Sequence, residues 1–382
     1  MKKYLICCGN SNDINTWSGI PFHFLNSAKE LSFELEGINL DPEKLTKYKL
    51  LWNLKQLLFT GGFSGFQYSD FFLRKLLKQA NIKNNEKVLI ISHYPFLPDV
   101  LNSKNFNVVF YLDATTKQII QEYKLNKFIS NKYKEKILRK EKLNYKYSRL
   151  IFTMSIWAKE SLIRDYDVKP EKIKVIPCGA NIQNKFLKEK DEIILPESPS
   201  SLEPIKIGFN GKDWHRKGGP TALKIVEQIN KNGIPAVLRV IGVSNNVLPD
   251  NKYIKNLGYI DKSKNMEKFI TEIQSWHFGT LFSKSEAFGI SNRECFLLGV
   301  PVICFDVGGI RSTFPDDDYN YGRIFQPNEK IEVMTNWILE TLKDYPSYIQ
   351  YRKKIYENNQ EFKWDTTVKK IFHNLSFIQN KN

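Results

Sequence analysis

The chain has 382 residues, of which 42% are hydrophobic and 13% aromatic, so it can bury real cores and is not a disordered protein. Its length exceeds one ordinary domain and suits two of about 150–200 residues each. The formal charge of +16, from 57 basic and 41 acidic residues, fits an anionic partner or lysines spread over solvated helix faces. We expect no nucleic-acid partner, because no recognised nucleic-acid-binding module occurs.

The cysteines and the apolar runs indicate in which cellular compartment we expect the protein. The cysteines are five in number and show no C-x-x-C spacing, which predicts buried thiols in a reducing cytoplasm. The first apolar run is too short for a signal peptide, and no run approaches the ~20 residues of a membrane span. We expect a cytoplasmic protein, at most peripheral at the inner face of the membrane.

Strand-length apolar runs alternate with helix-length amphipathic stretches in the first half. The runs are YLICC, KVLIISHY, VVFYLD, SRLIFTMS and KIKVIPCG. The amphipathic stretches include IPFHFLNSAKELSFELEGINL, FLPDVLNS and IWAKESLIRDYDV. Near-continuous apolar strands separated by helices predict a parallel sheet that is covered on both faces.

The periodicity breaks at residues 190–203, which are rich in Pro, Ser and Glu and are typical of a linker. It resumes with the strand-like runs IKIGFNG, AVLRVIG, FGTLFS and PVICFDVGG. We predict an α/β protein of two Rossmann-like domains facing each other across a cleft. The predicted domains are residues 1–195 and 203–360, and a C-terminal helix within 361–382 crosses back to the first.

Two carboxylates stand out in SEAFGISNRE, Glu286 and Glu294. On one continuous helix they would be separated by ~12 Å along the axis and would not share a face. Ser291 and Asn292 are good capping residues, so we predict that a helix begins there, with Glu294 in its first turn and Glu286 in the preceding loop. The helix N-terminus would then favour a phosphate, and the carboxylates would accept hydrogen bonds from sugar hydroxyls.

Two other turns suit anions. Lys212, Arg216 and Lys217 follow a predicted strand among glycines that include Gly211, and their charges can neutralise a diphosphate. Gly19 lies between the first predicted strand and its helix, where parallel sheets often accept anions. Each turn alone is equally compatible with a solvated loop, and the first lacks the G-x-x-x-x-G-K-[ST] phosphate-loop pattern.

Together these motifs resemble the retaining, family-four glycosyltransferases of the GT-B type. The resemblance rests on KDWHRKGG, FSKSEAFGISNRECFLLGVPVICFDVGGI and SIWAKESLIRDYDVKPEKIKVIPCGANI. It covers residues 150–330 well and the first 150 more loosely. It implies a hexosyltransferase that moves a sugar from a nucleotide-sugar, such as a UDP- or GDP-sugar, to a hydroxyl of a glycan or lipid-linked acceptor. It also implies retention of the anomeric configuration, with no cofactor and no metal.

The resemblance implies roles for individual residues. Glu294 would bind the ribose of the donor, and Glu286 hydroxyls of its sugar. Lys217, paired with Arg216 or Lys212, would hold the departing diphosphate, and Gly19 would make room for it. The amides of Phe288, Gly289 and Ile290 would support sugar and phosphate.

The first half departs from the family at one position, because relatives carry a His where this chain has Asp113. Asp113 and His93 are therefore candidates for contacts with the donor sugar or the acceptor, although a histidine at a strand end is as well explained as a loop residue. Carboxylates also gather in PDDDYN at 315–320, which we interpret as a solvated turn and not a metal site.

Two alternatives in function remain open from the sequence, a sugar-nucleotide epimerase and a catalytically silent sugar-nucleotide-binding protein of the same fold. The lysine-rich stretch up to residue 147 is compatible with an ordinary helix. Its lysines, among them Lys132, Lys134 and Lys136, are also compatible with an anionic membrane surface.

Overall fold

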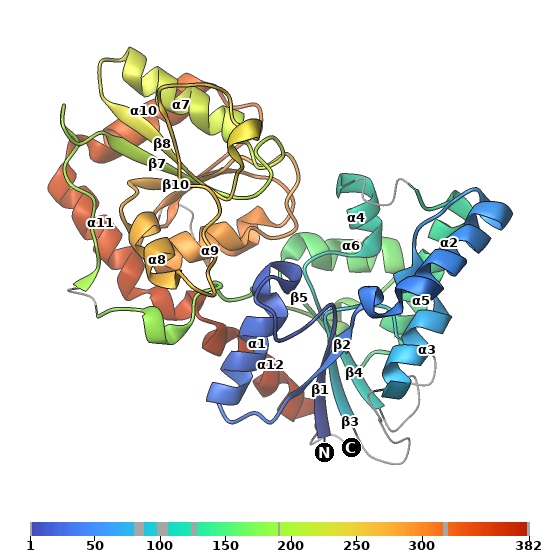
Figure 1. The fold of residues 1–382 in the computed structure, drawn as a ribbon. Coiled ribbons are helices and arrows are strands. Elements are labelled where there is room, and N and C mark those ends of the chain that lie inside the picture. The colour runs from blue at the N-terminus through green and yellow to red at the C-terminus, as the bar shows by residue number, and fades with distance from the viewer. Residues whose placement is uncertain are drawn as a thin grey trace. The chain divides into compact units, whose positions relative to one another are not determined.

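The computed structural model describes residues 2–79, 88–97, 106–123, 128–189, 192–315 and 320–379. It divides into two compact units, an N-terminal unit of Met1–Pro177 with Thr367–Asn382 and a C-terminal unit of Cys178–Thr366. Each unit is a sheet with helices on its faces (Figure 1). The fold class is therefore the predicted one, a pair of Rossmann-like domains.

The N-terminal unit contains a six-stranded parallel sheet in the order β2-β1-β3-β4-β5-β6. All five residues of the central β3 are buried, as expected for a strand covered on both faces. The strands are β1 (Lys2–Cys8), β2 (Glu36–Leu40), β3 (Val88–Ser92), β4 (Phe106–Leu112), β5 (Leu150–Thr153) and β6 (Ile173–Val175).

Strand β2 corrects the sequence interpretation, which extended a helical stretch to residue 40. The helix ends at Glu30, and Glu36–Leu40 pairs in parallel with β1 at the edge of the sheet. Only Ile38 and Leu40 of this strand are buried. A short edge strand with alternating burial carries little of the apolar signal by which the central strands were recognised.

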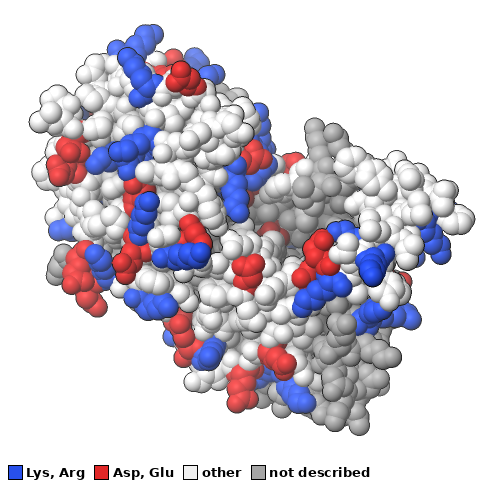
Figure 2. All heavy atoms as spheres, viewed as in Figure 1, with Lys and Arg blue, Asp and Glu red and all other residues white. Residues whose placement is uncertain are grey.

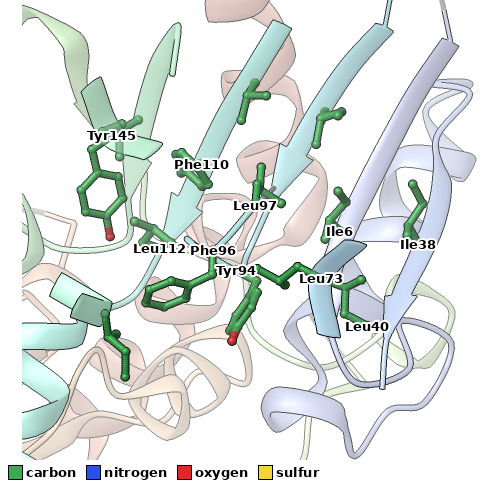
Figure 3. Packing of buried hydrophobic residues seen from close by; sticks show 14 of the residues in the cluster. Ile6, Ile38, Leu40, Leu73, Tyr94, Phe96, Leu97, Phe110, Leu112 and Tyr145 are labelled. Atoms are coloured by element: carbon green, nitrogen blue, oxygen red, sulfur yellow. The ribbon is translucent and has the colours of Figure 1, made fainter. Parts of the chain in front are cut away.

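The helices of the N-terminal unit lie on both sides of this sheet (Figure 1). Between them and the strands lies a core of aliphatic and aromatic side chains, in which Ile6, Phe96, Phe110 and Tyr145 are fully or almost fully buried (Figure 3). The helices are α1 (Ile20–Glu30), α2 (Thr46–Thr60), α3 (Asp70–Gln79), α4 (Thr116–Tyr123), α5 (Asn131–Tyr147) and α6 (Ile156–Tyr166).

The C-terminal unit repeats the architecture with the strand order β12-β11-β10-β7-β8-β9, again all parallel. Its strands are β7 (Ile205–Asn210), β8 (Ala236–Ile241), β9 (Ile254–Asn256), β10 (Phe278–Leu281), β11 (Val302–Phe305) and β12 (Gly322–Phe325). Its helices are α7 (Gly219–Lys231), α8 (Met266–Gln274), α9 (Ile290–Leu297), α10 (Ile331–Lys343) and α11 (Tyr345–Glu357).

The last helix, α12 (Trp364–Gln379), begins in the C-terminal unit and continues in the N-terminal one. There the Phe372 ring stacks on Phe33, with centroids 4.0 Å apart, and Thr367 donates a hydrogen bond to the Pro177 carbonyl. Among the described residues, no helix has both the length and the apolar character needed to cross a bilayer.

His277, just before β10, is held neutral by its surroundings. Its Nδ1 accepts from the Lys206 N–H at 3.0 Å, so Nε2 carries the proton that is donated to the Glu197 carbonyl at 3.1 Å. The pKa of His277 is lowered to about 3, mainly by burial; the hydrogen bond to Glu197 opposes this shift, and the charges of Arg352 and Lys206 add to it. Protonation of His277 in the folded protein would put a proton on Nδ1, where it would face the Lys206 N–H.

This histidine should make stability depend on pH. Because the pKa is lower in the folded state than the ~6.5 of an unfolded histidine, its contribution is complete above pH 6.5 and is lost as the pH falls toward 3. At pH 5 the loss is about 2 kcal/mol. Urea unfolding of His277→Asn at pH 7 and pH 5 should show a pH dependence smaller by that amount than in the wild type. An equal pH dependence would contradict the assignment.

Candidate active site

The candidate active site of the C-terminal unit lies where its strand order reverses. The chain runs from β7 outward to β8 and β9, and then returns to place β10 on the other side of β7. Loops that leave neighbouring parallel strands at such a point diverge and form a crevice at the carboxyl edge of the sheet. The loops after β7 and β10, residues 211–218 and 282–289, are the ones that carry the predicted basic and acidic residues.

Three of those residues meet at one carboxylate oxygen. Glu286 Oε2 lies 3.4 Å from Lys217 Nζ and 3.5 Å from Arg216 Nη1, and it accepts a hydrogen bond from Ser283 Oγ at 3.2 Å. The Glu286 and Lys217 side chains are 13% and 17% exposed, so the ion pairs are partly shielded from water. The two cations and the carboxylate together form a site where an anion and hydroxyl groups can bind side by side.

The two loops are joined by hydrogen bonds that hold this cluster together. The Lys284 N–H donates to the Arg216 carbonyl at 2.8 Å, and Arg216 Nη1 donates to the Ser285 carbonyl at 2.9 Å. Gly211 leaves space for the Lys217 stem, since a Cβ at this position would lie 2.3 Å from Lys217 Cδ. Gly211 is therefore important for placing the lysine.

The loop after β11 fixes the backbone of Glu286. The Gly309 N–H donates to the Glu286 carbonyl at 3.0 Å, and a Cβ on Gly308 would come within 2.1 Å of the same oxygen. Gly308 also has φ +58°, which disfavours other residues. Gly308 and Gly309, the GG of the downstream motif, thus hold the backbone of the residue that carries the carboxylate.

Helix α9 starts earlier than predicted, which corrects the capping assignment. Its N-cap is Gly289 with φ 104°, and Ser291 and Asn292 are already helical. A glycine reaches this left-handed conformation more readily than serine or asparagine, so the cap falls two residues earlier. Glu294 consequently lies just beyond the first turn. Phe288 is buried directly before the cap, and Ile290 is the first helical residue.

Glu294 is 2% exposed and already has partners. Its Oε2 accepts from Asn210 Nδ2 at 2.9 Å, and its Oε1 forms an ion pair with Lys262. Asn210 is the last residue of β7, so the carboxylate is held at the carboxyl end of the same strand that leads to Lys217. The structure thus places both glutamates in the same unit but with different partners.

Lys212 lies apart from that cluster. Its Nζ is 5.4 Å from the centroid of the Tyr259 ring, whereas Arg216 shares Glu286 with Lys217. Arg216 is therefore the basic residue that lies with Lys217 at Glu286, and its pairing with Lys217 on a diphosphate stays a prediction.

The N-terminal unit has a cavity of ≈ 350 Å³ at the carboxyl ends of β1, β3 and β4, which contains two further candidates, His93 and Asp113. Much of the wall is aromatic and apolar. The lining residues are Cys8, Trp17, Tyr68, His93, Tyr94, Pro95, Phe96, Leu112, Asp113, Ala114, Thr116 and Ile119.

His93 lies in the wall of this cavity, and its role in binding stays a prediction. Its ring is 5% exposed, its Nδ1 lies 3.0 Å from the Tyr111 carbonyl, and Trp17 packs on it with centroids 5.1 Å apart. Since a carbonyl can only accept, Nδ1 carries the proton and Nε2 keeps a lone pair. Burial lowers the pKa of His93 to about 4, partly offset by the bond to Tyr111, so Nε2 is an acceptor at neutral pH.

Gly19 ends a tight turn before α1. It is the N-cap of that helix with φ 88°, and Trp17 and Ser18 before it also have positive φ, at 45° and 57°. Consecutive residues of this kind are strained and concentrate at ligand-binding turns. This is the turn for which the sequence predicted anion binding, and that role stays a prediction.

Sequence reasoning missed several residues at these sites. Asn210 has a readable signal, a polar residue at the end of an apolar strand, but Lys262 and Ser283 have none, because their positions depend on loops. Trp17 was not singled out from the sequence. The acidic run at 316–318 and the stretch FLPDVLNS from residue 98 lie outside the described residues.

The two parallel sheets described above have the architecture of the GT-B glycosyltransferases. Residues 190–362 match the model of the family Glycosyl transferases group 1. The matched range contains both glutamates and the basic loop.

Solved structures of similar fold span the whole chain. Sucrose-phosphate synthase from Thermosynechococcus elongatus is 16% identical with a TM-score of 0.67, and covers 100% of both chains. HepE of Anabaena, solved with UDP and glucose, is 15% identical with a TM-score of 0.65, covering 98% of this chain and 99% of its own. WaaG, a glycosyltransferase involved in lipopolysaccharide biosynthesis, is 12% identical with a TM-score of 0.60, covering 97% and 98%. No curated protein matches the sequence.

Proposed function

We propose that this glycosyltransferase is a retaining enzyme that transfers a sugar from a nucleotide-sugar to an acceptor hydroxyl without a metal ion. The observation that carries the proposal is the meeting of Arg216, Lys217 and Glu286 at one oxygen atom. Two cations held in place suit the leaving diphosphate, and a carboxylate beside them suits the hydroxyls of the sugar.

The charges that develop in the reaction match this cluster. Cleavage of the bond between sugar and phosphate builds negative charge on the diphosphate and positive charge on the sugar. Lys217 and Arg216 stabilise the first, and the carboxylate of Glu286 lies close to the second. Preorganised charges of this kind act mainly on the transition state, since they need no rearrangement when the bond breaks.

In this proposal, retention requires no carboxylate nucleophile on the protein. We propose that the acceptor hydroxyl attacks from the face that the diphosphate leaves. A phosphate oxygen then takes the hydroxyl proton, so no protein base is required. The cations that replace a metal are the two basic residues after β7.

The cavity of the N-terminal unit is proposed to bind the acceptor or the donor sugar. His93 Nε2 can accept a hydrogen bond from a hydroxyl, and Asp113 can accept another. Trp17 and Tyr94 offer faces on which a sugar ring packs. Because His93 and Asp113 both line a cavity of ≈ 350 Å³, a ring-sized group can touch them together.

A thermal-shift screen of UDP-, GDP- and ADP-sugars is the first test, with UDP-glucose included because HepE was solved with UDP and glucose. A donor at 100 times its Kd should stabilise the fold by about 2.7 kcal/mol. The product made with that donor should keep its anomeric configuration by NMR, and EDTA should leave the rate unchanged. An inverted product, or activity that EDTA abolishes and Mg²⁺ restores, would contradict the proposal.

A further inference from the structure

Helix α2 exposes an unusual amount of apolar surface. Leu50, Leu51, Leu54, Leu57 and Leu58 are between 49% and 73% exposed, and no residue of the helix is buried. Five leucines on one short helix are normally buried, because each exposed side chain forgoes about 1.5–3 kcal/mol of burial. The surface therefore needs an explanation other than folding.

The leucines lie on one side of the helix. At about 100° per residue they occupy a stripe roughly 120° wide. The partly buried residues, among them Trp52, Asn53 and Gln56, occupy the opposite side. Trp52 packs on Tyr133 and Phe66, with ring centroids 5.3 and 6.0 Å apart, so its side faces the unit. The leucine stripe consequently points away from the unit and into solvent.

Aromatic residues extend the apolar surface at the C-terminal end of α2. Phe59 is 76% exposed, Phe63 46% and Phe128 55%, and the last two rings lie 4.7 Å apart. Leucine and phenylalanine are the residues that interfacial helices place among lipid chains. Figure 2 shows an uncharged surface over α2, with basic residues next to it.

The charges around this surface are mainly positive. Lys44, Lys47 and Lys55 are exposed. Of the nearby acids, Glu43 pairs with Lys49 at 2.6 Å and Asp70 pairs with Lys140 of α5. A second copy of the chain would bring the same lysines against these, which opposes a dimer through α2. An anionic surface is the complementary partner.

We propose that the outer face of α2, with Phe59 and Phe63, docks on an anionic lipid bilayer. The leucines and phenylalanines enter the boundary between head groups and chains, and the lysines contact lipid phosphates. Each basic residue near such a surface adds attraction that salt weakens. The proposal does not depend on the proposed sugar transfer, because vesicle binding requires neither donor nor acceptor.

This surface differs from the one that the sequence suggested. Helix α5 carries Lys132, Lys134 and Lys136, but it buries Ile137 and Tyr145 in the core as an ordinary amphipathic helix does. Its leucines do not form a comparable stripe. We expect α5 to add positive charge near the membrane, whereas α2 supplies the insertion.

The test is co-sedimentation with vesicles of phosphatidylglycerol and phosphatidylcholine in equal parts, and with phosphatidylcholine alone. Replacing Leu50, Leu51, Leu54 and Leu58 by glutamine should lower the partition coefficient ~10²-fold or more. Leu202→Gln with Val333→Gln is the control, since these apolar residues are 88% and 45% exposed in the C-terminal unit. Circular dichroism should show that both variants are folded.

Binding by the wild type and the control but not by the α2 variant supports the proposal, as does weaker binding to the neutral vesicles. Three results would overturn it. The wild type binds no vesicles; the α2 variant binds as the wild type does; or charge reversal at Lys132, Lys134 and Lys136 abolishes binding while the α2 variant retains it. A dimer in sedimentation velocity that the α2 substitutions dissociate, without vesicle binding, would instead assign the face to a second copy.

Discussion

Lys217→Met is expected to lower kcat by ~10²-fold or more while changing the melting temperature little. Methionine keeps an apolar stem over Gly211 and removes only the charge. The lost interaction acts on the departing diphosphate and therefore on the transition state. Glu286 still has Arg216 and Ser283 as partners, so the loop should remain folded. Steady-state kinetics with thermal denaturation measures both effects.

Three further variants make this result specific. Arg216→Ala should also lower kcat, and more than Lys212→Ala does, because Lys212 lies over Tyr259 and not beside Lys217. Lys224→Ala, on the exposed side of α7, is the control for loss of a lysine elsewhere in the unit. If Lys217→Met melts early but turns over normally, Lys217 is a structural residue.

Glu294→Gln is expected to weaken binding of the donor nucleotide by roughly 10- to 150-fold, which corresponds to about 1.5–3 kcal/mol for a hydrogen bond to a charged group. A carboxylate can accept about four hydrogen bonds, so it can hold Asn210, Lys262 and two ribose hydroxyls together. Glutamine has the same shape but only one accepting oxygen. Isothermal titration calorimetry with the nucleoside diphosphate gives the affinity.

Replacing Glu294 by alanine would be harder to interpret, because this substitution would leave Asn210 and Lys262 without their carboxylate partner. The glutamine variant limits this disturbance, and urea unfolding checks it. Asn210→Ala should weaken nucleotide binding less, since Asn210 positions the carboxylate. Unchanged affinity in Glu294→Gln would remove Glu294 from the nucleotide site.

The sequence predicts the sheets because their central strands are nearly continuous apolar runs. Strand β3 is buried throughout, and its run KVLIIS is rich in β-branched residues, which favour strands. Strand β2 has two buried residues and an exposed start, so EGINL looked like the end of a helix. What distinguishes it is pairing with β1, a contact that no local pattern reports.

The candidate site, like the sheets, could be predicted from the sequence only in part. Glycines, cations and glutamates near strand ends indicated where an anion would bind. The geometry among them required the neighbouring placement of β7 and β10, which brings Arg216 within reach of Glu286 across 70 residues. The cap of α9 was misplaced because capping residues were weighed by type, whereas the backbone conformation of Gly289 determines where the helix begins.

On the proposed function, the ion pairs of Glu286 also affect release of the nucleotide product after each turnover. Without a ligand, Arg216 and Lys217 neutralise the carboxylate. On the proposed function, a diphosphate attracts both cations away from it, and the hydroxyls of an attached sugar would then join Ser283 as hydrogen-bond donors to this oxygen. Once the sugar has moved to the acceptor, the spent nucleotide competes with Glu286 for the cations and offers nothing in return. On the proposed function, the carboxylate that binds the sugar of the intact donor would thus also favour release of the spent nucleotide.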